Sequence, residues 1–593
     1  MHVYLTPIFD ATDQNATSIR VLMKLRNTKA QAAKGLITLP LNMGPTPTAR
    51  YDGDAIAAYD DFGSLALSII DTNESDAWRT WIPDRDPQGE VRLAFVAPAR
   101  KTDATTPTGP RIDLRADQGG LIGEGLGFLP FPPRTEDWDV FVDWDLLGAP
   151  LRTTAAWSLG DGLHNHIVGV PSEVIGQAVF AVGPLQRYPD WVVVPPANFD
   201  AQILQTTNSQ RFAMYWFGTP PFDMDDLTKS TEKLFLSIAD FFDDHSSTFR
   251  VFIRRVENGH GGKGGQCSFM MEYSPGSEEE LTIWSLLNLL AHETVHEYPL
   301  MLPEKEVDGW YNEGIAVYYA EIAPFVGGAM SKKELLYSMN QHAQAYYTSP
   351  MVQMDMDDVV KHMWDDIHIN RVIYFRGFMY LAQVNGLVVS ATEGKRSLDD
   401  IVMALYRRKR NHEPCGTQDF VKLLSNLIGV EEARQSMETM WRGDVIIPPE
   451  DGFSQFGLKL VRRDAEKFDL GFDPISLKTK KITGLVKTSR ADLAGIRDND
   501  EVVTAFMPWG AADTLEGMMQ LSVRRDDEVI FDKILASKLG ESRVLDVDRG
   551  RWRSEIRAVD ITKIDRLESP DWAKKQTRKS HPSHAILMFL SSI

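Results

Sequence analysis

The chain has 593 residues, of which 43% are hydrophobic and 25% charged, and its formal charge is −20. This length exceeds one hydrophobic core and predicts a soluble protein of about three or four domains. The negative charge argues against nucleic acid or an anionic membrane surface as the main partner. With two cysteines, Cys267 and Cys415, no disulfide framework is expected. We find no signal peptide and no membrane span, and therefore expect a cytoplasmic protein.

The N-terminal part, up to about residue 170, consists of short segments in which apolar and polar residues alternate. Ser18–Met23 and Val91–Phe95 are examples, and clusters of Gly, Pro, Asn and Asp separate such segments. Alternation with a period of two is typical of half-buried strands, and frequent turn residues favour a sandwich of sheets. We predict an N-terminal β-sandwich domain over residues 1–175.

A glycine-rich segment marks a change from strands to helices. The strand-like run Phe249–Arg254 leads into a predicted loop, Gly259–Gly265. Beyond it the apolar spacing predicts two helices, Glu279–Tyr298 and Gly309–Ile322, the second ending before Pro324. Further helical patterns cover residues 332–346, 372–383, 397–409, 418–427 and 430–440. We predict a mainly helical domain over residues 176–446.

Short strand-like runs return after a predicted linker at Ile447–Pro449. They include Gly457–Leu460, Ile482–Val486 and Glu528–Phe531. Their length and composition predict a third, β-rich domain over residues 450–593. The whole chain is therefore predicted to be a multidomain α+β protein.

The segment His292–His296 carries an HExxH motif within the first predicted helix. On a helix, His292 and His296 lie one turn apart on the same face. Glu313, in the second predicted helix, can complete a His₂Glu zinc site that keeps one position open for water. The alternative is a salt-bridged structural glutamate near two core histidines.

Two further residues would carry the chemistry of such a zinc site. Zinc lowers the pKa of bound water and polarises a scissile carbonyl, and Glu293 would take the water's proton and deliver it to the leaving amine. The oxygen of the substrate needs a second stabilising donor, for which Tyr374 is a candidate. By spacing alone, a tyrosine in an apolar helix is more often a core residue.

Three motifs together resemble the M61 peptidases, the glycyl aminopeptidase family. These are His292–His296, Trp310–Gly314 and Ile373–Gly377, the last resembling a Tyr-x-Lys/Arg-Gly segment. M61 enzymes are distant relatives of the M1 aminopeptidases, and both are gluzincins, in which HExxH is followed by a downstream glutamate ligand. The resemblance implies a thermolysin-like catalytic domain and assigns Tyr374 as a catalytic residue.

The third predicted domain is similar to a PDZ domain, which M61 enzymes carry behind the catalytic domain. The similarity is carried by Phe456–Leu460, Ile482–Val486 and Ala491–Val503. A PDZ domain adds an extended peptide to its sheet edge and holds the terminal carboxylate on backbone amides. The resemblance therefore implies a C-terminal peptide ligand, and a purely structural role is an equal alternative.

The chain departs from the M61 pattern before the zinc helix. Where the family has Gly-Gly-Leu-Glu-His, this sequence has Gly264 and Gly265 followed by Gln266–Ser268, and the two glycines are candidate substrate-binding residues. Glu272, a few residues later, is a candidate for the carboxylate that binds the substrate's amino terminus, and an ordinary strand residue is the alternative. The interval between His296 and Glu313 is also short compared with that of M1 enzymes, which we interpret as a shorter loop.

The leading hypothesis is a zinc metallopeptidase of M61 type that removes amino-terminal residues from short peptides. One alternative keeps the fold but acts on a specialised amide or ester, or on a blocked peptide. Another is a PDZ-bearing interaction protein with a non-catalytic zinc site. The presence of both Glu293 and Tyr374 favours an enzyme, since a scaffold needs neither a base nor an oxyanion donor.

Overall fold

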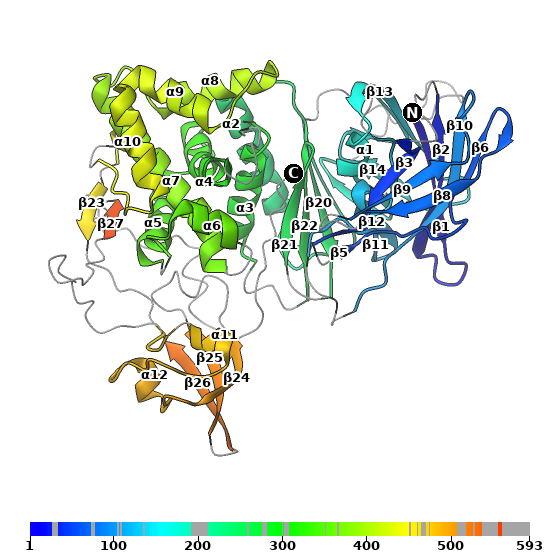
Figure 1. The fold of residues 1–593 in the computed structure, drawn as a ribbon. Coiled ribbons are helices and arrows are strands. Elements are labelled where there is room, and N and C mark those ends of the chain that lie inside the picture. Colours follow the sequence, from blue (N-terminus) through cyan, green and yellow to red (C-terminus); the bar gives the residue numbers. More distant parts are fainter. Residues whose placement is uncertain are drawn as a thin grey trace. The chain divides into compact units, whose positions relative to one another are not determined.

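The computed structural model divides into two compact units. Unit 1 includes Met1–Phe235 and Asp244–Leu290, and unit 2 includes Leu236–Asp243 and Ala291–Ala585. Figure 1 shows the helices and strands, coloured along the sequence. The described residues are 1–26, 34–44, 46–72, 77–103, 106, 109–133, 137–190, 211–257, 260–275, 281–298, 301, 308–349, 351–363, 367–449, 452–458, 460–463, 470–473, 475–506, 518–525, 528–536 and 556–559.

The largest sheet of unit 1 has seven strands in the order β16-β13-β1-β2-β10-β6-β7. Alternate side chains along its strands are buried, as in Val91–Pro98, because successive residues of a strand point to opposite faces. The strands are β16 (His164–Pro171), β13 (Asp137–Trp144), β1 (His2–Phe9), β2 (Ala16–Leu25), β10 (Val91–Pro98), β6 (Ala57–Asp60) and β7 (Gly63–Ser64).

Smaller sheets share a hydrophobic core with this one. Val21 of the large sheet, Trp81 of a three-stranded sheet and Phe180 of a five-stranded sheet belong to one buried cluster. The smaller elements are β3 (Ile37–Pro40), β9 (Trp78–Pro83), β8 (Leu67–Asp71), β4 (Asn42–Met43), β5 (Thr46–Pro47), β11 (Arg115–Asp117), β12 (Gly120–Glu124), β17 (Val179–Gly183), β14 (Thr154–Trp157), β15 (Gly160–Asp161) and α1 (Val174–Gln177). The β-rich N-terminal region is thus confirmed, and by sheet membership it extends to Gly183.

A mixed five-stranded sheet completes unit 1, in the order β18-β19-β20-β22-β21. Its elements are β18 (Gln186–Tyr188), β19 (Phe212–Trp216), β20 (Phe249–Arg255), β21 (Gly261–Gly265) and β22 (Ser268–Tyr273), and helix α2 (Met224–Phe241) connects β19 to the parallel β20. The prediction of a loop up to Gly265 was wrong, because β21 pairs antiparallel with β22. Glycine is required at Gly262, where a Cβ atom would lie 1.7 Å from the ring of Phe269.

Helices dominate the described part of unit 2 up to Trp441, as the apolar spacing predicted. They are the end of α3 (Ile283–Val295), then α4 (Gly309–Val326), α5 (Lys332–Thr348), α6 (Met356–His362), α7 (Ile367–Ala391), α8 (Leu398–Arg410), α9 (Thr417–Ile428) and α10 (Val430–Trp441). The predicted stop before Pro324 was wrong, because α4 includes this proline near its C-terminal end. Along the sequence, the helical middle region is preceded and followed by β-containing regions, which confirms a multidomain α+β chain.

Helices α4 and α7 approach each other closely at two glycines. A Cβ atom on Gly377 would lie 2.0 Å from the carbonyl oxygen of Trp310, and one on Gly314 would lie 2.5 Å from the carbonyl carbon of Gly377. No larger residue fits either position without moving a helix backbone. The close crossing matters because Glu313 and Tyr374 lie next to these glycines on α4 and α7.

One helix in the described part of the chain is long and apolar enough to cross a membrane. This segment is His368–Ala391 of α7, and 72% of its most apolar stretch is buried inside the protein. From the sequence we expect no membrane span. Burial on this scale is what the core helix of a folded domain requires.

The C-terminal region contains a small separate hydrophobic cluster that includes Phe472, Ile482, Ile496 and Val523. Its elements are α11 (Ile475–Thr479), α12 (Arg490–Leu493), and an antiparallel sheet of β24 (Glu501–Phe506), β25 (Met518–Arg525) and β26 (Glu528–Ala536). A two-stranded pair joins β23 (Leu460–Arg463) to β27 (Ile556–Val559).

Three strand predictions fall in this region. Glu528–Phe531 lies within β26 and is confirmed. Among the described residues of Gly457–Leu460, Leu460 alone belongs to a strand, and Ile482–Val486 forms none. Ile482 is instead buried in the small core. The predicted extension beyond Val559 lies outside the described residues.

Candidate metal centre

The end of helix α3 places the two histidines of the HExxH motif. The helix ends at Val295, so that His292 lies in its last turn and His296 directly follows it. Backbone turns from Thr294 to Glu297 and from Val295 to Tyr298 continue the helical path beyond this end. The two imidazoles therefore lie one turn apart on one side of the chain, as the spacing predicted.

The beginning of helix α4 places Glu313. Trp310 and Tyr311 on the same turn are fully buried and hold this end of the helix in the core. The neighbouring Asn312 accepts a hydrogen bond of 2.9 Å from the backbone amide of Met301. This contact ties the segment that follows His296 to the helix that carries Glu313.

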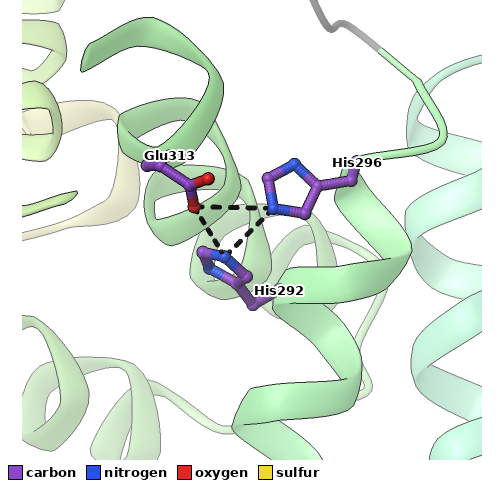
Figure 2. A group of neighbouring side chains, drawn as sticks. All are labelled: His292, His296 and Glu313. Atoms are coloured by element: carbon purple, nitrogen blue, oxygen red, sulfur yellow. Dashed lines mark hydrogen bonds and ion pairs between the residues drawn. The ribbon is translucent and has the colours of Figure 1, made fainter. Parts of the chain in front are cut away.

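The three side chains converge on one point, as Figure 2 shows. Glu313 Oε2 lies 3.2 Å from His292 Nε2 and 3.6 Å from His296 Nε2, and the two ring nitrogens are 3.1 Å apart. Ligand atoms about 2.0–2.1 Å from a tetrahedral zinc ion are about 3.3–3.4 Å from one another. The spacing and the His₂Glu donor set therefore fit a zinc-sized ion with one coordination position left over. Among the described residues, this is the one group of three or more such side chains that could hold a metal.

The electrostatics of this centre favour a bound cation. Burial opposes ionisation of Glu313, but the two imidazoles outweigh it and lower the pKa of the carboxyl to about 2. Burial likewise opposes a charge on His296, yet Glu313 and other nearby carboxylates raise its pKa above the ordinary 6.5. An ionised carboxylate is the form in which Glu313 binds metal, and the negative surroundings that raise the pKa of His296 also attract a metal cation, which displaces the proton of the imidazole when it binds.

Glu293 and Tyr374 belong to the same neighbourhood. The ring of Tyr374 stacks on His292, with centroids 5.9 Å apart. Burial and the charges of Glu313 and Glu293 raise the pKa of Tyr374 well above its usual value of 10. The phenol thus stays protonated and can donate a hydrogen bond. Glu293 itself is buried and also acts electrostatically on His296.

The structure therefore brings together, within unit 2, all five residues predicted to form the reaction centre: His292, Glu293, His296, Glu313 and Tyr374.

The candidate substrate residues belong to unit 1. Glu272, on β22, is buried and accepts a hydrogen bond of 2.7 Å from Arg254 Nε, while its second oxygen lies 3.1 Å from Arg111 Nε. Because both carboxylate oxygens already face guanidinium groups, this geometry favours the structural alternative for Glu272. Gly264 and Gly265 lie on the edge strand β21, where Gly264 is exposed.

Sequence reasoning missed one residue next to the centre. Lys409, near the end of α8, donates hydrogen bonds of 3.2 and 3.0 Å to the backbone carbonyls of Glu297 and Tyr298. These carbonyls belong to the turn immediately after His296. No local pattern could have indicated this contact, since a lysine in a basic helix end is ordinarily a solvated residue.

No protein-family model matches the chain, and the search of curated proteins gave no match. Among solved structures, an aminopeptidase N family protein from Idiomarina loihiensis has a TM-score of 0.61 at 12% identity, covering 94% of this chain and 97% of that one. This likeness shows that the two chains share a fold.

Two further structures have lower TM-scores. An M1 zinc metallopeptidase mutant from Deinococcus radiodurans, bound to a Tyr-Ser-Ala substrate, gives 0.46 at 17% identity over 76% of this chain and 94% of that one. Native yeast LTA4 hydrolase gives 0.42 at 14% identity over 76% and 68%.

Proposed function

We propose that this protein is a zinc-dependent peptidase, and within that class an aminopeptidase of M61 type. The observation that carries the proposal is the convergence of His292 Nε2, His296 Nε2 and Glu313 Oε2 at tetrahedral spacing. Support also comes from the fold shared with an aminopeptidase N family protein. The M61 assignment rests on the motifs around Glu293, Glu313 and Tyr374.

Each side chain of the centre has a part in peptide hydrolysis. Bound zinc would supply an acidified water and polarise the scissile carbonyl. His292, His296 and Glu313 hold the ion, and Glu293 accepts the proton of the attacking water and passes it to the leaving amine. Tyr374, kept protonated by its raised pKa, donates a hydrogen bond to the carbonyl oxygen as negative charge develops there.

The preference for a free amino terminus is the least supported part of this function. Glu272 was the candidate anchor for the substrate's amine, but its carboxylate is engaged by Arg254 and Arg111. This observation favours a second candidate function, the hydrolysis of amino-terminally blocked peptides or of a specialised amide or ester. Matched peptides with free and acetylated amino termini separate the two, since an aminopeptidase cleaves only the free series.

The C-terminal region is proposed to be a PDZ-like domain of a cytoplasmic enzyme. Its support is the sequence similarity of Phe456–Leu460 and Ala491–Val503 together with an independent small core. Its proposed ligand is the carboxyl end of a peptide, held as an added strand. A panel of peptides with free and amidated carboxyl ends tests this, because amidation removes the group that such a domain recognises.

The decisive experiment for the enzyme is a Glu293→Gln substitution in the full chain. It keeps the size of the side chain but removes the base, and we expect zinc to remain bound while turnover falls by about 10²–10⁴-fold. Glu432→Gln, on an exposed position of α10, is the matched control and should retain activity. Bound zinc with unchanged turnover in Glu293→Gln contradicts the proposed mechanism, and bound zinc without turnover in the unmodified protein favours the scaffold alternative.

A further inference from the structure

Helix α8 contacts the segment that carries His296. The carbonyl groups after the end of a helix lack partners within that helix and need donors from elsewhere. Lys409 Nζ donates hydrogen bonds of 3.2 and 3.0 Å to the backbone carbonyls of Glu297 and Tyr298. The positive charge of Lys409 near the C-terminal end of α3 also interacts favourably with the negative end of the helix dipole.

The ring of Tyr298 strengthens the same junction. Tyr298 is fully buried, and its ring packs edge-on against Tyr406 of α8, with centroids 5.8 Å apart. It also stacks on Phe242, with centroids 5.0 Å apart and nearly parallel planes, and Phe242 itself packs edge-on against Tyr406. The residue two positions after His296 is therefore held by packing as well as through its backbone.

The opposite end of α8 is tied to the helices that carry Glu313 and Tyr374. Tyr319 of α4 donates a hydrogen bond of 2.5 Å to Asp399 Oδ1 in the first turn of α8. Asn385 of α7 accepts a hydrogen bond of 3.0 Å from the backbone amide of Leu398. One helix thus connects to all three elements that supply the metal centre.

We propose that α8 is a brace for the metal centre and that Lys409 is a positioning residue for His296. This inference rests on the proposed zinc site and extends it to residues that touch neither metal nor substrate. Without the ammonium group, the turn after α3 loses two hydrogen bonds and the imidazole of His296 gains freedom to leave its position. Zinc should then be released faster, because outer partners of metal ligands typically contribute about 10–100-fold to metal affinity.

The test uses the full-length zinc-loaded protein and three substitutions on α8. Lys409→Met removes the donor at similar length, Lys409→Arg retains a charged donor, and Arg407→Met changes an exposed residue of the same helix. For each folded variant, the rate of zinc release is measured with an excess of a chelating dye. The melting temperature and the visible spectrum of the cobalt-substituted protein are recorded as well.

We expect Lys409→Met to release zinc about tenfold faster and to alter the cobalt spectrum. Lys409→Arg should restore most of the slow release, and Arg407→Met should match the unmodified protein. A lower melting temperature with unchanged zinc release in Lys409→Met overturns the inference, as does equally fast release in Lys409→Met and Lys409→Arg.

Tyr319→Phe provides a second variant at the far end of α8, for the case in which Lys409→Met does not fold. It removes the bond to Asp399, and a severalfold faster zinc release supports the brace, whereas unchanged release counts against it. Failure of the proposed function is distinguishable from failure of this inference. An unmodified protein that holds no zinc refutes both, while one that holds zinc without turnover refutes only the enzyme.

Discussion

Two buried groups of charged side chains differ in what they leave for a ligand. In unit 1, Arg254 lies between Glu272 and Asp113, with hydrogen bonds of 2.7 and 2.8 Å, so that cations and carboxylates balance within the protein. In unit 2, a carboxylate oxygen of Glu313 and the ring nitrogens of His292 and His296 point toward one another. Buried charge alone therefore does not indicate a reaction centre. What distinguishes the second group is a set of acceptor atoms that a single cation can satisfy together.

The strongest way to test this difference is to remove a carboxylate from the metal centre. Glu313→Gln replaces an anionic ligand by a neutral amide, and we expect zinc affinity to fall by more than about 100-fold, beyond the loss typical of outer partners. Peptidase activity should disappear with the metal. Zinc content and competitive chelator titration measure the effect, with Glu432→Gln as control. Retention of zinc at unchanged affinity contradicts the role of Glu313 as a ligand.

The corresponding change in unit 1 should alter stability without altering the chemistry. Arg254→Met leaves Glu272 and Asp113 without their shared guanidinium, and breaking a buried ion pair costs about 3–5 kcal/mol. Denaturant unfolding measures this loss, with Arg255→Met at an exposed position of the same strand as control.

Glu272 is either a structural residue or the residue that binds the substrate's amino terminus, and the two roles predict different effects of a substitution on substrate binding. If Glu272 is structural, Glu272→Gln lowers stability and leaves KM for free peptides unchanged in the folded protein. A selective rise in KM for peptides with a free amino terminus would instead show that Glu272 binds the substrate.

Tyr374→Phe separates metal binding from catalysis within unit 2. Loss of one oxyanion donor typically lowers kcat by about 10²–10³-fold. Zinc should remain bound because the phenol is not a ligand, with at most the loss of about 10–100-fold in affinity that is typical of an outer partner, since Tyr374 is hydrogen-bonded to Glu313. Tyr337→Phe, at an exposed position of α5, is the matched control. The outcome that contradicts the assignment is a kcat equal to that of the control variant.

Local spacing was sufficient to predict which side chains converge at the candidate metal centre, but not their surroundings. His292 and His296 are four residues apart on one helix, so their common face follows from helix geometry alone. The proximity of Tyr374 depends on the glycine crossing of α4 and α7, and the Lys409 contact joins residues more than one hundred positions apart. Such pairings arise from tertiary packing, to which a single sequence gives little access.

The errors in the predicted strands have the same origin. The glycine-rich segment ending at Gly265 has low intrinsic strand propensity, yet it pairs with β22, and at Gly262 the ring of Phe269 occupies the space that a side chain would fill. Ile482 begins a segment whose apolar pattern resembles a strand, but its burial comes from the small C-terminal core without a ladder of strand pairs. Tertiary packing decided both cases against the local pattern.

The two groups should also differ in their response to pH. The pKa of His296 is raised above 6.5, so in the metal-free protein its protonation stabilises the fold below pH 6.5, and this contribution is lost as pH rises through the raised pKa. The pKa of Glu313 is lowered to about 2, so its contribution is present above the ordinary value of 4.5 and is lost as pH falls towards 2.

Zinc must displace the proton on His296, and apparent zinc affinity should therefore rise about tenfold per pH unit below the pKa of His296 and level off above it. The ion pair of Arg254 and Asp113 should itself contribute constantly between pH 5 and 8, since the guanidinium group stays charged and the pKa of Asp113 lies at about 2. The buried His260, whose pKa is lowered to about 4, adds a separate loss of stability as pH falls below 6.5, so the contribution of the pair is measured as the difference between the unmodified protein and Arg254→Met. Chelator competition and denaturant unfolding across this range measure the two responses side by side. Zinc affinity that does not vary over this range would mean that His296 binds zinc without releasing a proton, and the electrostatic distinction between the two groups would fail.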